Sequence, residues 1–138
     1  MGGPGVVAKA SPCTVGLQVG AAQGSGVIVS RDGYVLTMPH VVGRPGREAR
    51  IRLPGESELQ GKTLGIHATA DAGLVKIAGS GQWPYTPLVS RDQAPKVGDW
   101  CIALEISRGQ DSESVQARFT DWKVHGESTA ADVWQSKI

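Results

Sequence analysis

Two residues in this sequence have the types and spacing to form an acid–base pair. His40 follows Met38 and Pro39, and Asp71 stands 31 positions further along the chain. An imidazole beside a serine or cysteine can take the proton of the hydroxyl or thiol, and a carboxylate then holds the imidazole tautomer and stabilises the imidazolium. The same two residues could also be a surface histidine in a proline-rich loop and an aspartate that caps a turn. The surrounding elements favour the catalytic pair.

A β-hairpin is predicted to carry His40 to a defined place. The short apolar runs Gly26–Ser30 and Tyr34–Thr37 are typical of strands, and Gly33 between them supplies the positive φ that a tight turn needs. Proline cannot donate to a sheet ladder, so the chain must leave the sheet at Pro39. His40 is therefore expected just past the end of a strand.

Asp71 is predicted to lie at a comparable position. The chain between the two candidate residues is long enough for an antiparallel pair of strands, predicted at Ala49–Leu53 and Leu59–His67. Asp71 then stands just before the predicted strand Leu74–Ile77. Catalytic side chains are commonly mounted on loops that a rigid scaffold positions, which is the placement expected for both residues.

Three segments together carry a resemblance to a known family. The first runs from Gly24 to Val42 and contains His40, the second is Thr69–Ile77 with Asp71, and the third is Pro87–Leu104. Their order and spacing are similar to those of the trypsin-like serine peptidases, specifically the HtrA/Deg branch. The resemblance implies an all-β, trypsin-like double β-barrel. It also implies serine endopeptidase activity through an acyl-enzyme, with His40 as general base and Asp71 as the carboxylate that orients it.

The nucleophile implied by this resemblance has no counterpart in the sequence. In the family the serine lies in a Gly-Asn/Asp-Ser-Gly-Gly loop, whose glycines let backbone N–H groups converge into an oxyanion hole. The 138 residues contain no such loop, and Val133–Ile138 is similar to the strand that leads into it. We therefore expect a truncated peptidase domain that is inactive alone. Ser128 is the rival candidate, but it lacks both following glycines, and a polar loop is the better interpretation.

Length and composition bound the fold. A chain of 138 residues can bury one good core but is short for two barrels. Its 19 glycines, 8 prolines and 40% hydrophobic residues fit an all-β domain of short strands and many turns. We predict a complete N-terminal barrel at residues 1–80, which holds His40 and Asp71, and a partial C-terminal barrel at residues 81–138. Further strands are expected at 14–19, 87–90, 100–104, 114–122 and 133–136.

Charge and cysteine content argue against several function classes. The net charge is only +1, and Glu48 interrupts an arginine cluster at positions 44, 47, 50 and 52. Both features argue against a nucleic-acid partner, and the arginines are expected in solvated loops and at a strand edge. The sequence has no long apolar run, so no membrane span is predicted. The histidines and cysteines lack metal-ligand spacing, and no cofactor or metal is expected. Cys13 and Cys101 are expected to be buried free thiols, and His67 a structural histidine.

Two function hypotheses from different classes remain open. In the first, the full-length protein cleaves peptide or unfolded protein substrates. In the second, the chain is a non-catalytic pseudopeptidase that binds peptides or partner proteins in the same cleft. An unfinished second barrel would also expose unpaired strand edges, so self-association through Ser114–Trp122 and Val133–Ile138 is expected. The resemblance implies an extracytoplasmic location, periplasmic or secreted.

Overall fold

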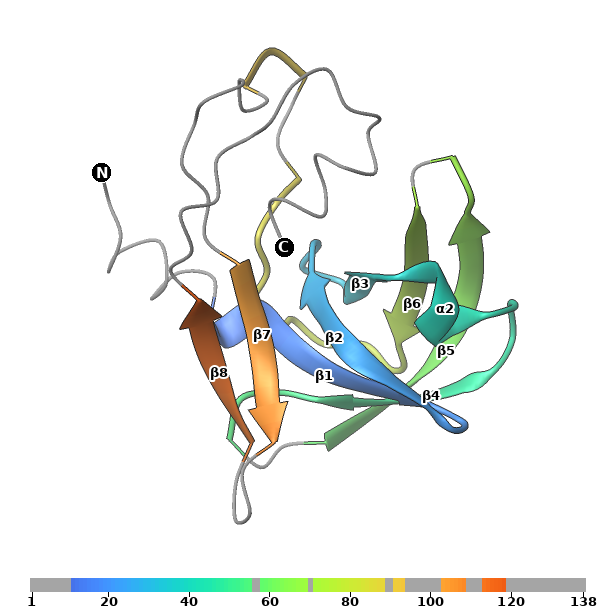
Figure 1. The fold of residues 1–138 in the computed structure, drawn as a ribbon, viewed down its shortest axis with the longest axis horizontal. Coiled ribbons are helices and arrows are strands. Elements are labelled where there is room, and N and C mark those ends of the chain that lie inside the picture. Colours follow the sequence, from blue (N-terminus) through green and yellow to red (C-terminus); the bar gives the residue numbers. More distant parts are fainter. Residues whose placement is uncertain are drawn as a thin grey trace.

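The chain between Thr14 and Ile77 folds into a closed β-barrel in the computed structural model. The structure describes residues 11–55, 58–69, 71–88, 91–93, 103–108 and 113–118. Six antiparallel strands close the barrel in the order β1-β2-β3-β6-β5-β4 (Figure 1). The strands are β1 (Thr14–Val19), β2 (Ala22–Ile28), β3 (Tyr34–Thr37), β4 (Glu48–Arg52), β5 (Glu58–His67) and β6 (Ala72–Ile77).

Short helical turns and one further hairpin complete the described elements. The helical turns are η1 (Ser11–Cys13), α2 (Pro39–Val42) and η2 (Arg91–Gln93). Strands β7 (Ala103–Arg108) and β8 (Glu113–Arg118) pair antiparallel in a separate two-stranded sheet. In Figure 1 this hairpin lies beside β1 and β2.

The barrel is filled by small, mostly β-branched side chains. In β6 buried and half-buried residues alternate, as expected for a strand with one face toward the core. The largest fully buried side chains include Ile28, Ile51 and Ile77, one each from β2, β4 and β6. Cys13 is buried, as predicted, whereas Cys101 lies outside the described residues. β-branched side chains suit these positions because they are stiff and pack well on a pleated surface.

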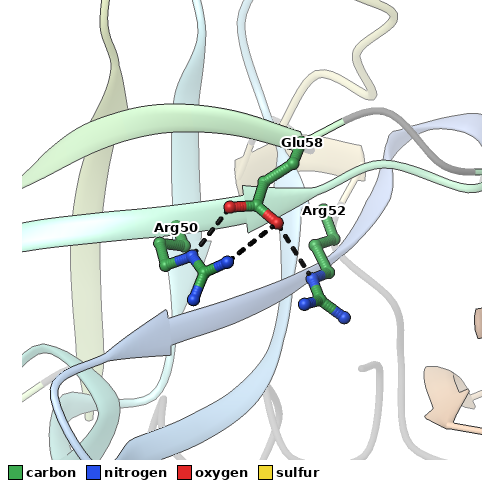
Figure 2. Close-up of polar contacts among 3 residues, drawn as sticks. All are labelled: Arg50, Arg52 and Glu58. Atoms are coloured by element: carbon green, nitrogen blue, oxygen red, sulfur yellow. Dashed lines mark hydrogen bonds and ion pairs between the residues drawn. The ribbon is translucent and has the colours of Figure 1, made fainter.

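The hairpin of β4 and β5 carries a cluster of ion pairs on its surface. The Arg50 guanidinium donates two hydrogen bonds to the Glu58 carboxylate, Nε to Oε1 at 2.7 Å and Nη2 to Oε2 at 3.2 Å. Arg52 Nε lies 3.3 Å from the same Oε2 (Figure 2). The hydrogen bonds from Arg50, and the positive charges of both arginines, hold the pKa of Glu58 below its usual value. Two of the four clustered arginines thus pair with a carboxylate across the strands.

The predicted fold class is confirmed. The chain is all-β with a closed first barrel, and the predicted strands at 14–19 and 34–37 have the bounds of β1 and β3. The two-stranded sheet β7–β8 within the described residues is consistent with an incomplete second barrel. The division of domains at residue 80 stays a prediction. Val133–Ile138, part of the expected self-association surface, lies outside the described residues.

Some predicted strand positions were wrong. β2 begins at Ala22 rather than Gly26, because Val19 pairs with Ala22 across a two-residue turn and the strand continues from there. The stretch from Ala22 to Ser25 contains no β-branched residue, so the pattern did not predict it. In the second half, Pro87 and Leu88 lie in no strand, and β7 covers Ala103–Arg108 rather than the predicted 100–104.

No helix within the described residues is long and apolar enough to cross a membrane.

Candidate active site

His40 lies in α2, a single helical turn that directly follows β3. Thr37, the last residue of β3, is buried, and its hydroxyl donates a hydrogen bond to the carbonyl of Ser25 in β2 at 2.8 Å. Met38 then takes an extended conformation, and Pro39 begins the helical turn. The amide of Gly43 closes the turn by donating to the Pro39 carbonyl at 2.9 Å. The prediction that His40 lies just past a strand end is therefore confirmed.

The single helical turn was missed by sequence reasoning. A four-residue helix contains barely one turn, so no hydrophobic periodicity can mark it. Pro39 at its first position is the local signal that could have found it, because proline is favoured there.

Two glycines of the barrel let α2 pack closely onto the sheet. A Cβ atom on Gly24 of β2 would lie 2.7 Å from Val41 Cγ2, and one on Gly73 of β6 would lie 2.6 Å from Val42 Cγ2. Both valines are fully buried, while the neighbouring His40 is exposed. The buried valines thus anchor the turn, and the imidazole is left accessible at the surface.

Asp71 lies at the end of the turn that joins β5 to β6. Its amide donates to the carbonyl of Ala68 at 3.2 Å, and the residue is half-buried. The backbone of Asp71 has φ 52°, the left-handed region that residues with a Cβ rarely adopt. Among the described residues it is the one non-glycine with positive φ.

The segments that carry His40 and Asp71 pack against each other. The contact is formed by Val42 and Gly73, and each of these residues stands two positions after a candidate site residue. The carbonyl of Met38 also lies 3.0 Å from the position of a Gly73 Cβ. The fold therefore brings α2 and the start of β6 to the same part of the barrel.

An apolar hollow of about 310 Å³ lies next to this region. Strands β3, β5 and β6 line it with Leu36, Leu64, Gly65, Ile66, His67, Ala72, Gly73 and Leu74. Leu64 and Ile66 are 43% and 49% exposed, which is high for such side chains. His67, interpreted from the sequence as structural, is exposed at the end of β5 opposite Ala72. The alternating pattern of β5 did not predict this outward apolar face.

The other candidate residues fall differently. Ser128 lies outside the described residues, so the structure says nothing of it. Within the described ranges, no three His, Cys, Asp or Glu side chains are grouped so that they could hold a metal ion.

Comparison with known proteins places this arrangement in a family. The trypsin-like peptidase domain family matches residues 24–136, a stretch that includes α2, β6 and both candidate residues. The chain belongs to the trypsin-like peptidase domain family.

Several curated relatives are also similar to the chain. Two of them are probable periplasmic DegP-like serine endoproteases, one from Ectopseudomonas mendocina and one from Pseudomonas putida. They are 42% and 41% identical to this chain, each over 88 residues, which is 64% of this chain and 18% of the relative. Another, from Brucella suis, is 35% identical over 97 residues, 70% of this chain and 18% of the relative. The chain thus spans about a fifth of the length of these relatives. The resemblance to the HtrA/Deg peptidases is confirmed.

Proposed function

We propose that His40 and Asp71 are the general base and the orienting carboxylate of a serine endopeptidase that acts on peptide or unfolded protein substrates. The observation that carries the proposal is the packing of α2 on β6, where Val42 meets Gly73 two residues beyond each candidate. A general base must come within hydrogen-bond reach of its partners, and apo geometry can be looser than the working geometry. Membership of the peptidase family supports the same assignment.

In this mechanism His40 moves the proton in both half-reactions. It takes the proton of the serine hydroxyl as the oxygen attacks the scissile carbonyl, and it returns a proton to the leaving amine when the tetrahedral intermediate collapses to the acyl-enzyme. In the second half-reaction the imidazole takes a proton from water as the water oxygen attacks the acyl carbonyl, and it returns that proton to the serine oxygen as the acyl–oxygen bond breaks and the acid product leaves. Asp71 holds the imidazole in the tautomer that can accept the hydroxyl proton and stabilises the imidazolium.

The backbone of Asp71 supports a functional role. A residue with a Cβ at φ 52° is in a sparsely populated conformation, and such residues cluster at active sites where the surrounding fold holds them. Asp and Asn tolerate the left-handed region better than other residues. An aspartate is therefore a residue type that supplies a carboxylate at this position for a modest conformational cost.

A second candidate function is a peptidase-like binding module without activity. It differs from the peptidase in the nucleophile, since the 138 residues contain no Gly-Asp/Asn-Ser-Gly-Gly loop. The nucleophile and oxyanion hole supply much of the rate in acyl transfer. The peptidase that we propose therefore needs a nucleophile from outside these residues. The periplasmic relatives support an extracytoplasmic location for either function.

The isolated chain is expected to be inert toward casein and toward a fluorophosphonate probe that labels activated serines. Mass spectrometry of the probe-treated chain checks this expectation, with the full-length peptidase of a relative as positive control. Stoichiometric labelling of Ser128 would contradict it, because the chain would then be a complete enzyme with an unusual nucleophile.

The proposed pair itself is tested by nitrogen NMR of the His40 ring. With Asp71 as hydrogen-bond acceptor, one tautomer of the neutral imidazole should dominate. Asp71→Asn should shift the tautomer populations of His40, and the backbone amide spectrum of the variant shows whether the rest of the barrel is unchanged. Unchanged His40 populations in Asp71→Asn would refute the pair and leave the binding module as the better function.

A further inference from the structure

Thr63 of β5 joins the barrel to the loop that follows α2. The residue is 1% exposed, and its hydroxyl donates to the Arg44 carbonyl at 2.6 Å and accepts from the Arg47 amide at 2.8 Å. Its backbone makes two more bonds to the same loop, because the Thr63 amide donates to the Arg47 carbonyl at 2.9 Å and the Gly46 amide donates to the Thr63 carbonyl at 2.8 Å. Four hydrogen bonds thus fasten residues 44–47 to one strand residue.

The fastened loop is directly continuous with the end of α2. The Arg44 amide donates to the Val42 carbonyl at 2.9 Å, and Arg47 Nη1 approaches the same carbonyl at 3.4 Å. The Arg47 guanidinium also lies against two turns of the backbone, 2.6 Å from a Cβ position on Gly20 and 3.0 Å from one on Gly43. Restraint of the loop therefore reaches the carbonyl end of the helical turn that carries His40.

An irregularity in β5 accompanies this arrangement. The register between β5 and β6 shifts between Thr63 and Gly65, a β-bulge. Bulges are common next to active sites, where they redirect a side chain. Pro45 of the loop lies 3.8 Å from a Cβ position on the bulge residue Gly65, so the loop meets β5 at a second point.

We infer that the Thr63 hydroxyl is a positioning group for His40. It acts through the backbone of residues 44–47 and the end of α2, and it touches neither substrate nor the reacting atoms. This inference rests on the proposed function in giving His40 a catalytic role. The Arg44 carbonyl and the Arg47 amide both bond to this one buried hydroxyl, and an apolar side chain of the same shape would remove both hydrogen bonds.

The test compares Thr63→Val, which keeps the shape, with Thr63→Ser, which keeps the hydroxyl. Thr14→Val is the matched control, since Thr14 is also buried in the barrel but lies in β1. We expect amide exchange at Arg47 to rise about tenfold in Thr63→Val and to stay near the parent value in Thr63→Ser. We also expect the His40 tautomer populations and ring shifts to change in Thr63→Val, to recover in Thr63→Ser and to stay constant in Thr14→Val.

Faster exchange at Arg47 with an unchanged His40 ring would overturn the inference, because the hydroxyl would then hold the loop alone. An equal His40 response in Thr14→Val would overturn it as well. Should Thr63→Val not fold, Thr63→Cys replaces it, since a thiol has a similar size and only weak hydrogen-bonding capacity. Asp71→Asn separates this inference from the proposed function, because it tests the pair while leaving Thr63 and its loop in place.

Discussion

Two hairpin turns of the barrel share one hydrogen bond and a positive φ at the last turn residue, and they differ in the residue type at that position. In the turn between β2 and β3, the Gly33 amide donates to the Ser30 carbonyl at 3.1 Å, and Gly33 has φ 95°. In the turn between β5 and β6, the Asp71 amide donates to the Ala68 carbonyl at 3.2 Å, and Asp71 has φ 52°. Each residue stands directly before the second strand of its hairpin.

The surroundings explain why one turn uses glycine and the other an aspartate. A Cβ on Gly33 would lie 2.9 Å from Ile77 Cβ and 3.1 Å from the Trp83 ring, so that turn has no room for a side chain. Asp71 stands at the same position of its own turn and has a positive φ despite its Cβ, which is an unfavourable conformation. Packing selects the residue in the first turn, and we propose that chemistry selects it in the second.

The largest expected effect is on the packed turn. Gly33→Ala should lower the free energy of unfolding by about 3 kcal/mol, because the Cβ adds overpacking to an unfavourable positive φ. Gly55→Ala is the matched control, since Gly55 has φ 97° and open space around its Cβ position. It should cost about 1 kcal/mol. Urea unfolding of both variants checks the difference, and equal losses would show that the contacts of Gly33 do not matter.

A smaller effect is expected at the turn that carries Asp71. Valine is poorly tolerated at positive φ, whereas asparagine is tolerated much as aspartate is. Asp71→Val should therefore be less stable than Asp71→Asn by about 1–2 kcal/mol in thermal or urea unfolding. Equal stabilities would mean that the turn relaxes to another conformation, and the parallel with Gly33 would fail.

The sequence predicted the parts of the site that local signals mark. Pro39 ended a strand, Gly33 marked a hairpin, and both placed His40 just outside the sheet. The position of Asp71 before β6 was also predicted, but its positive φ was not, because the Asp in this turn carries no glycine signal. Local turn chemistry is therefore a good guide to where the candidate residues enter and leave the strands.

The contacts that hold the site together could not be predicted. Gly24 and Gly73 admit α2 to the sheet because they lack a Cβ, and a sequence does not tell which distant side chain fills that space. Thr63 likewise contacts a loop 16 to 19 positions earlier in the chain. Such pairings depend on the register of the closed barrel, which the alternating pattern does not fix by itself.

The smallest expected effect concerns a carboxylate with a purely structural role, in contrast to Asp71. Hydrogen bonds from Arg50 and the nearby positive charges lower the pKa of Glu58 from its ordinary 4.5. Glu58 therefore contributes stability that is fully present above about pH 4.5 and is lost as the pH falls through the lowered folded-state value. Glu58→Gln should thus have a lower free energy of unfolding than the parent at neutral pH, and the two values should converge in acid.

Glu48→Gln is the control, because the Glu48–Lys62 pair is longer at 3.7 Å and more exposed. This variant should lose less free energy of unfolding at neutral pH than Glu58→Gln does. Unfolding measured across this pH range for all three proteins decides the matter, and a constant gap between parent and Glu58→Gln down to strong acid would show that the ion pairs in Figure 2 do not stabilise the barrel.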